Sequence, residues 1–217
     1  NTRYRTFWSS NPLREMYANY PTYPTLDDHE IKGDWGSERA HATKQFAALK
    51  TGALQAYYDY QMKGVLPPNA AARDSFHYDF NYGNIGIFVM DIRSQRAVDA
   101  PNPLFGGLQF RDFRDFLRNN ATKKVLLIVT SVPVVHLADW LAVVGVKIIN
   151  PLLGLAGKDI DFPDHWSHTN NRPARDAFLS LLHAHQQAHP TQRIAILSGD
   201  VHIGNAFGVR WKGGSSK

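Results

Sequence analysis

Three short segments of this 217-residue chain gather side chains that could bind a metal ion or move protons. The first segment places Asp27, Asp28, His29 and Glu30 in succession. Four consecutive ionisable side chains cannot all be buried without partners, because an unpaired buried charge is strongly destabilising. The segment therefore indicates either a metal-binding carboxylate beside a histidine that serves acid–base chemistry, or a solvated acidic loop.

The second segment is an apolar run that ends in Gly199, Asp200, Val201 and His202. Residues two apart in an extended backbone point to the same side, so we expect the carboxylate and the imidazole to do so here. Such a pair of ligands suits zinc, iron or manganese, whereas a carboxylate alone suits calcium. The alternative is a β-turn that contains a hydrogen-bonded aspartate.

The third segment carries Asp91 directly after another apolar run, followed by Arg93 and Arg96. The Arg93 guanidinium could donate two hydrogen bonds to a phosphate, and Asp91 could orient a loop or an arginine. A purely structural Asp–Arg pair is the better explanation of this segment when it is taken alone.

The elements that must position these residues alternate between apolar strands and amphipathic helices. Helical spacing of apolar residues predicts helices over 43–62, 105–120 and 171–189. Apolar runs predict strands over 76–80, 85–90, 124–130 and 193–198, and a further strand over 206–211. Helices between buried strands indicate an α/β fold, in which strand exits are the first place to look for chemistry.

Composition narrows the classes of function. The chain has no cysteine, which excludes disulfides, thiolate metal sites and a catalytic thiol. Twenty-four Lys and Arg against nineteen Asp and Glu give a net charge of +5, which suits an anionic substrate but is too small to indicate nucleic acid. Neither a Gly-x-Ser-x-Gly elbow nor a phosphate-binding Gly-x-x-x-x-Gly-Lys loop occurs.

The most apolar stretch, residues 132–157, does not meet the requirements of a membrane span. It contains His136, Asp139 and Lys147 as well as Asn150 and Pro151. We expect a buried pair of helices there, with a surface flap that touches lipid or a bulky substrate as the alternative.

Together, in this order and spacing, the segments resemble the PhoD-like alkaline phosphatase family of metallophosphoesterases. The resemblance rests on residues 24–31 with the trailing Gly-Asp-Trp-Gly of 33–36, on 90–96 and on 198–202, and residues 166–182 are also similar. It implies a four-layer α/β/β/α sandwich that binds two or more metal ions, iron and calcium ahead of zinc or manganese. It also implies hydrolysis of small phosphate monoesters or diesters.

The resemblance implies a role for each matching residue. Asp28, Asp200 and His202 stand where the family places metal ligands, with Asp28 in the place of the Asn of a Gly-Asn-His motif. His29 matches the histidine of that motif, which implies contact with the phosphate and proton donation to the leaving group. Glu30 is expected to assist His29.

Other matching positions are expected to support this site. Arg93 is predicted to contact the substrate phosphate, and Asp27 and Asp91 to hold the loops in place. Thr130 and Ser131 follow a strand where other metallophosphoesterases often carry a metal-binding histidine, so a hydroxyl or a water would have to fill that role.

One family motif is absent. An upstream Gly-Asp segment usually supplies a metal-bridging aspartate, but residues 1–26 contain neither Gly nor Asp. We therefore expect residues 1–217 to form a single domain that is the C-terminal portion of the sandwich, incomplete at its N-terminus. The resemblance favours an extracellular or periplasmic location, and the absence of cysteine is compatible with either redox environment.

Two other functions stay open from the sequence. The first is a catalytically inactive or truncated metal-binding relative that acts as a binding module, which the missing motif favours. The second is a nucleic-acid-binding protein, suggested only by the isoelectric point of about 9.4. Steeply salt-dependent binding to DNA or RNA would distinguish it. Nothing in the sequence sets the oligomeric state.

Overall fold

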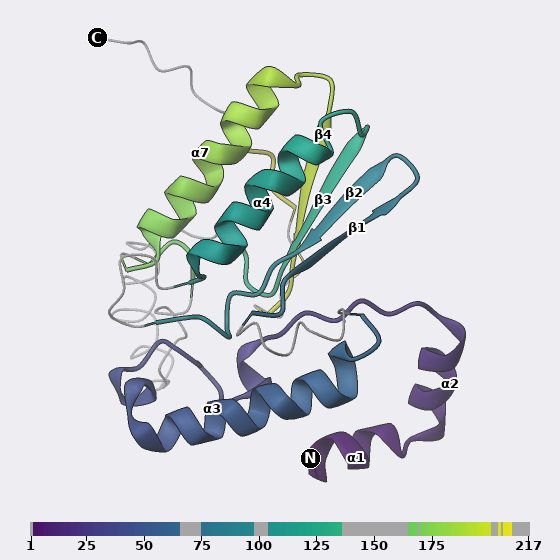
Figure 1. The fold of residues 1–217 in the computed structure, drawn as a ribbon, viewed down its shortest axis with the longest axis vertical. Helices are drawn as coiled ribbons and strands as arrows, with labels where there is room; N and C mark the ends of the chain where they lie inside the picture. The colour runs from purple at the N-terminus through teal and green to yellow at the C-terminus, as the bar shows by residue number, and fades with distance from the viewer. Residues whose placement is uncertain are drawn as a thin grey trace, which may run out of the picture.

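The described part of the chain is built on one four-stranded sheet (Figure 1). The computed structural model describes residues 2–65, 75–97, 104–135, 165–168, 170–200, 204 and 206–209. The strands are β1 (Tyr78–Tyr82), β2 (Ile85–Val89), β3 (Val125–Thr130) and β4 (Arg193–Ser198), in the spatial order β1-β2-β3-β4. Strands β1 and β2 form an antiparallel hairpin, and β2, β3 and β4 run parallel, so their carboxyl ends meet at one edge.

Helices α4 (Gly107–Asn119) and α7 (Arg172–Ala188) cover the same face of the sheet (Figure 1). The main core lies between them and the strands, and its aromatic rings interlock. The ring of Phe88 on β2 meets that of Phe113 on α4 edge-on at 5.0 Å, and Phe113 stacks on Phe178 of α7 at 5.1 Å. These contacts join both helices to the central strands, which confirms the predicted α/β class.

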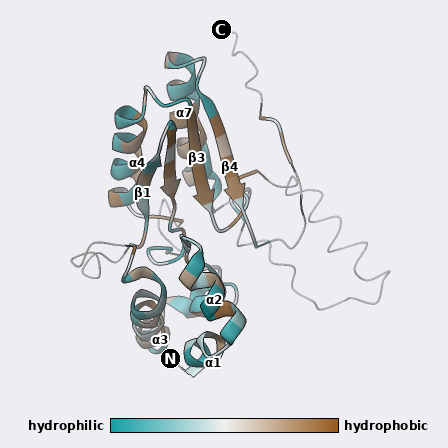
Figure 2. Cartoon of the chain, turned by 90° about the vertical axis from the view of Figure 1, so that its right-hand side faces the viewer, coloured by the Kyte–Doolittle hydropathy of each residue, from teal (hydrophilic) through white to brown (hydrophobic). Residues whose placement is uncertain are grey.

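The residues of the strands are mostly apolar (Figure 2), and their side chains are more exposed on the face that lies away from the helices. Along β3, Leu126 and Ile128 are buried against the helices, while Val129 on the other face is only partly buried. On β4, Leu197 is 53% exposed. The described residues contain one sheet, so the second sheet of the predicted four-layer sandwich stays a prediction.

The N-terminal segment lies beneath the carboxyl ends of the strands (Figure 1). It contains α1 (Thr2–Trp8), α2 (Asn11–Asn19) and α3 (Lys44–Tyr57), and α3 continues into a π-helical turn at Tyr58–Met62. A second apolar cluster includes Leu26, Trp35 and Tyr57. The helix predicted over 43–62 is thus present, whereas α1 and α2 were not predicted.

Two sequence predictions fall partly outside the described residues. Residues 206–209 have no regular secondary structure, so the strand predicted over 206–211 is wrong for that part. Residues 132–135 form no helix after β3, and the rest of the predicted helix pair lies outside the described residues. None of the described helices combines the length and the apolar character that crossing a bilayer requires.

The aromatic core makes a testable prediction about stability. We expect Phe88→Ala to lower the free energy of unfolding by about 3–5 kcal/mol, because it leaves a cavity among rings that cannot close fully. The Phe7→Ala control, at a ring that is 65% exposed, should change it by less than about 1 kcal/mol. Urea unfolding followed by circular dichroism measures both, and equal effects would contradict the assignment of the core.

Candidate metal centre

The loop that carries Asp27 and Asp28 is fastened across the strand exits by long-range contacts. The Thr25 hydroxyl donates to the Met90 carbonyl at 3.0 Å, and the Tyr78 hydroxyl donates to the Pro24 carbonyl at 2.9 Å. Leu26 between them is fully buried. The loop is therefore tied to the ends of the first two strands of the sheet.

A reciprocal cap shapes the acidic segment. Asp28–Glu30 forms one 3₁₀ turn, with Asp27 as its N-cap. The Asp27 side chain accepts the Glu30 amide, and the Glu30 carboxylate accepts the Asp27 amide at 3.0 Å, which is a capping box. Burial is the main cause that raises the pKa of Glu30. The Glu30 carboxylate is thus directed at the backbone, and its predicted assistance to His29 stays a prediction.

Asp28 is buried and held by two backbone amides. Its Oδ1 accepts the His29 amide at 2.7 Å, and its Oδ2 accepts the Asp34 amide at 2.6 Å. Asp34 has a left-handed backbone with φ 61°, a conformation that Asp tolerates better than most residues. These bonds fix the position of the carboxylate, and each oxygen keeps a lone pair for a further partner.

Three carboxylates converge at the carboxyl edge of the sheet. One oxygen each from Asp27, Asp28 and Asp200 lie within 4.8 Å of one another. Carboxylate oxygens are ligands for calcium, manganese and other hard cations, so the residues present fit a metal ion. Their mutual repulsion also favours a bound cation.

The backbone at Asp200 differs from the sequence prediction. Strand β4 ends at Ser198, and Asp200 is left-handed with φ 72°, so the extended backbone expected from Asp200 onward is wrong at Asp200 itself. His202 lies outside the described residues. The proposed pairing of Asp200 with His202 therefore stays a prediction.

Arg93 is fully buried and pairs with Asp27. Its Nε donates to Asp27 Oδ1 at 2.8 Å, its Nη2 lies 2.6 Å from the same oxygen, and its Nη1 donates to the Trp35 carbonyl at 3.5 Å. The pair holds Asp27 in place and offsets its charge. Phosphate contact by Arg93 stays a prediction.

Asp91 organises the loop that carries Arg93. Its carboxylate accepts the amides of Phe76, Arg93 and Ser94 and the Ser94 hydroxyl. Gln109 of α4 fixes its backbone, since the amide side chain accepts from the Asp91 N–H at 2.7 Å and donates to its carbonyl at 2.9 Å. The helix that covers the sheet thus also positions this strand exit.

His29 projects from the same turn into solvent. Its side chain is 83% exposed, and its Nε2 lies 4.0 Å from Asp28 Oδ2. Gly33 faces the ring, and a Cβ at Gly33 would lie 3.4 Å from its Cε1. The imidazole is therefore beside the carboxylates and accessible to a ligand.

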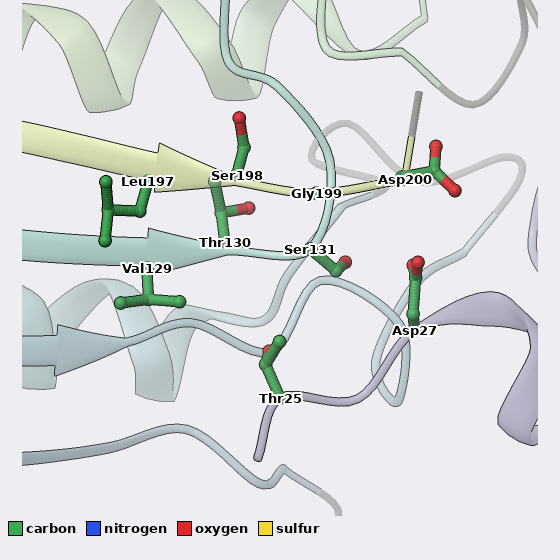
Figure 3. A pocket seen from close by; sticks show the side chains of 9 residues that line it. All are labelled: Thr25, Asp27, Val129, Thr130, Ser131, Leu197, Ser198, Gly199 and Asp200. Atoms are coloured by element: carbon green, nitrogen blue, oxygen red, sulfur yellow. The ribbon is translucent and has the colours of Figure 1, made fainter. Parts of the chain in front are cut away.

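A cavity of about 250 Å³ opens beside Asp27 and Asp200 (Figure 3). Two apolar side chains and several hydroxyls line it in addition to the acidic residues. The lining consists of Thr25, Asp27, Val129, Thr130, Ser131, Leu197, Ser198, Gly199 and Asp200. The sequence did not identify Thr25 or Ser198 as site residues. Thr130 pairs with Ser198 at the ends of β3 and β4, and this pairing places both residues at the carboxyl edge of the sheet.

The loop after the acidic turn is closed by a buried histidine. The Gly36 amide donates to His41 Nδ1 at 3.0 Å, and the His41 ring stacks on Trp35 at 5.0 Å. Gly36 has φ 88°, and the Arg96 side chain packs where its Cβ would be, so no larger residue fits. Burial, followed by the charge of Lys32, lowers the pKa of His41.

Comparisons with known proteins agree with these observations. A family profile described as "PhoD-like phosphatase" matches residues 1–216. "Alkaline phosphatase D" of Bacillus subtilis (strain 168) is 29% identical over 105 residues, which cover 46% of this chain and 18% of that relative. The match thus spans less than a fifth of the length of the relative. No solved structure matches.

The Gly36–His41 hydrogen bond makes stability depend on pH. The hydrogen bond requires a neutral His41 in the folded protein, whereas His41 of the unfolded chain takes up a proton near pH 6.5. The contribution of this hydrogen bond to stability is therefore complete above that pH, and it is lost as the pH falls through the lowered pKa of His41 in the folded protein. His41→Asn keeps an acceptor near Nδ1 but does not titrate. We expect wild-type stability, measured by urea unfolding between pH 8 and 5, to fall relative to the variant. Parallel pH profiles would contradict this, since Glu30 titrates in both proteins.

Proposed function

The chain belongs to the PhoD-like phosphatase family, and we propose that it takes part in metal-dependent hydrolysis of phosphate esters. The observation that carries the proposal is the convergence of Asp27, Asp28 and Asp200 beside a cavity at the carboxyl ends of parallel strands. Ligand sites of α/β sheets occur at this edge. The net charge of +5 suits an anionic substrate.

Asp28 and Asp200 would hold the metal, with Asp27 beside them and His202 as a further ligand. A bound metal ion lowers the pKa of its water and offsets phosphoryl charge. Iron and calcium are the first candidates by family, and zinc or manganese the next. The complete four-layer sandwich, with more than one metal, is part of the same proposal.

The protein's own side chains would position the reactants and move the proton. Arg93 keeps Asp27 turned toward the site, and the Asp34 amide keeps Asp28 there. As the oxygen of a water that has released one proton to solvent joins phosphorus, and the bond from phosphorus to the ester oxygen breaks, His29 would donate a proton to that departing oxygen and regain one from solvent. The exposed ring, 4.0 Å from Asp28, is free to approach a substrate.

Removing the carboxylates tests the metal centre. We expect Asp28→Asn and Asp200→Asn to lose bound metal and to reduce kcat/KM for an aryl phosphate at least about 100-fold, since loss of mere supporting partners already costs 10–100-fold. Plasma mass spectrometry and initial rates measure the two effects. Asp176→Asn, at an exposed carboxylate on α7, is the control.

Metal retained at wild-type level in both variants would show that these carboxylates are not ligands. Metal that is bound by the wild-type protein without turnover of phosphate monoesters or diesters would instead support the binding-module function.

The proton donor makes a separate prediction. His29→Ala should lower kcat for phenyl phosphate by about 10²–10⁴-fold, because the phenoxide that departs from this ester is basic and needs a proton. The loss should be much smaller for 4-nitrophenyl phosphate, whose leaving group is stable as an anion. Steady-state rates at saturating substrate measure both, and equal losses on the two esters would refute proton donation by His29.

A further inference from the structure

Ser131 carries a buried hydroxyl that has no partner among the described residues. It follows β3 directly, is 3% exposed, and its Oγ makes no hydrogen bond. Two neighbouring hydroxyls of the cavity are already engaged, since Thr25 donates to the Met90 carbonyl and Thr130 to the Val132 carbonyl. A buried polar group without a partner is destabilising, so it calls for an explanation such as an absent ligand.

The position of Ser131 is fixed by the sheet. The Gly199 amide donates to the Ser131 carbonyl at 3.1 Å, which continues the pairing of β3 with β4 by one residue. Figure 3 shows the Ser131 side chain directed toward the space between Asp27 and Asp200. The hydroxyl therefore lines the cavity at the point where the acidic residues meet.

We propose that the Ser131 hydroxyl donates a hydrogen bond to a non-bridging phosphoryl oxygen of the ester bound in this cavity. The inference rests on the proposed function and adds a substrate contact to it. The carboxylates around the site accept hydrogen bonds or bind cations, and they repel phosphoryl oxygens that no cation holds. A fixed neutral donor on that side supplies the contact that those oxygens need without adding negative charge.

The same geometry explains why serine serves here as a donor. A neutral hydroxyl is a weaker cation ligand than the three carboxylates beside it, so removing it should leave the metal in place. The Ser131 hydroxyl forms its hydrogen bond only when the phosphoryl group is bound, so this bond stabilises the complex and not the free protein.

The test compares Ser131→Ala with Ser180→Ala in the full chain as purified with its metal. Ser180 is exposed on α7 and does not belong to the lining of the cavity. Titration calorimetry with inorganic phosphate gives the dissociation constant, plasma mass spectrometry the metal content, and thermal unfolding in phosphate-free buffer the Tm. We expect Ser131→Ala alone to weaken phosphate binding about ten- to hundredfold, with metal content and Tm maintained.

Each other result overturns the proposal in a recognisable way. Unchanged phosphate affinity in Ser131→Ala excludes the contact. Loss of metal would make the hydroxyl a metal ligand, and a Tm lowered in phosphate-free buffer would show that it has a structural partner. A wild-type protein that binds no phosphate overturns this inference and the proposed function together, whereas wild-type binding that survives in Ser131→Ala overturns this inference alone.

Discussion

The arrangement of the site depends on holding three carboxylates together against their mutual repulsion. Two unit charges 4.8 Å apart, the limit for Asp27, Asp28 and Asp200, repel by about 3 kcal/mol at an effective dielectric constant of ~20. Two kinds of partner offset that repulsion. Arg93 neutralises Asp27 from a fully buried position, and backbone amides satisfy both oxygens of Asp28. Because these partners are themselves held in place, the fold fixes the positions of these carboxylates, and the acidic cluster is not a solvated loop.

The sheet and its covering helices hold those partners. Asp91 gathers three backbone amides and a hydroxyl at the exit of β2, and Gln109 of α4 fixes the Asp91 backbone. The core that packs α4 on β2 thus determines where Arg93 can lie, and Arg93 in turn determines where Asp27 can lie. The core is therefore connected to the carboxylates by a continuous series of hydrogen bonds.

Local patterns predicted what depends on local chemistry. The apolar runs at 85–90, 124–130 and 193–198 correspond to β2, β3 and β4, because a buried strand needs apolar side chains. The run of ionisable residues at 27–30 led to Asp27 and Asp28, and the Gly-Asp-Val-His sequence after an apolar run led to Asp200. Helices α1 and α2 were not predicted, and none of their residues is buried in the described structure. The family resemblance pointed to Ser131 as a residue that follows a strand, but its place beside Asp200 depends on the pairing of β3 with β4, which joins residues nearly seventy positions apart.

Backbone strain points to the same site independently of charge. Asp34 and Asp200 are the two non-glycine residues with positive φ in the described part of the chain. Each such residue costs of the order of 1 kcal/mol and persists only where its surroundings enforce it. The Asp34 amide donates to Asp28, and Asp200 contributes its own carboxylate to the cluster. Both residues with positive φ thus help to position the carboxylate oxygens of the acidic cluster. The stability that their backbone conformation costs is consistent with a fold that positions these oxygens to bind a ligand rather than to improve its own packing.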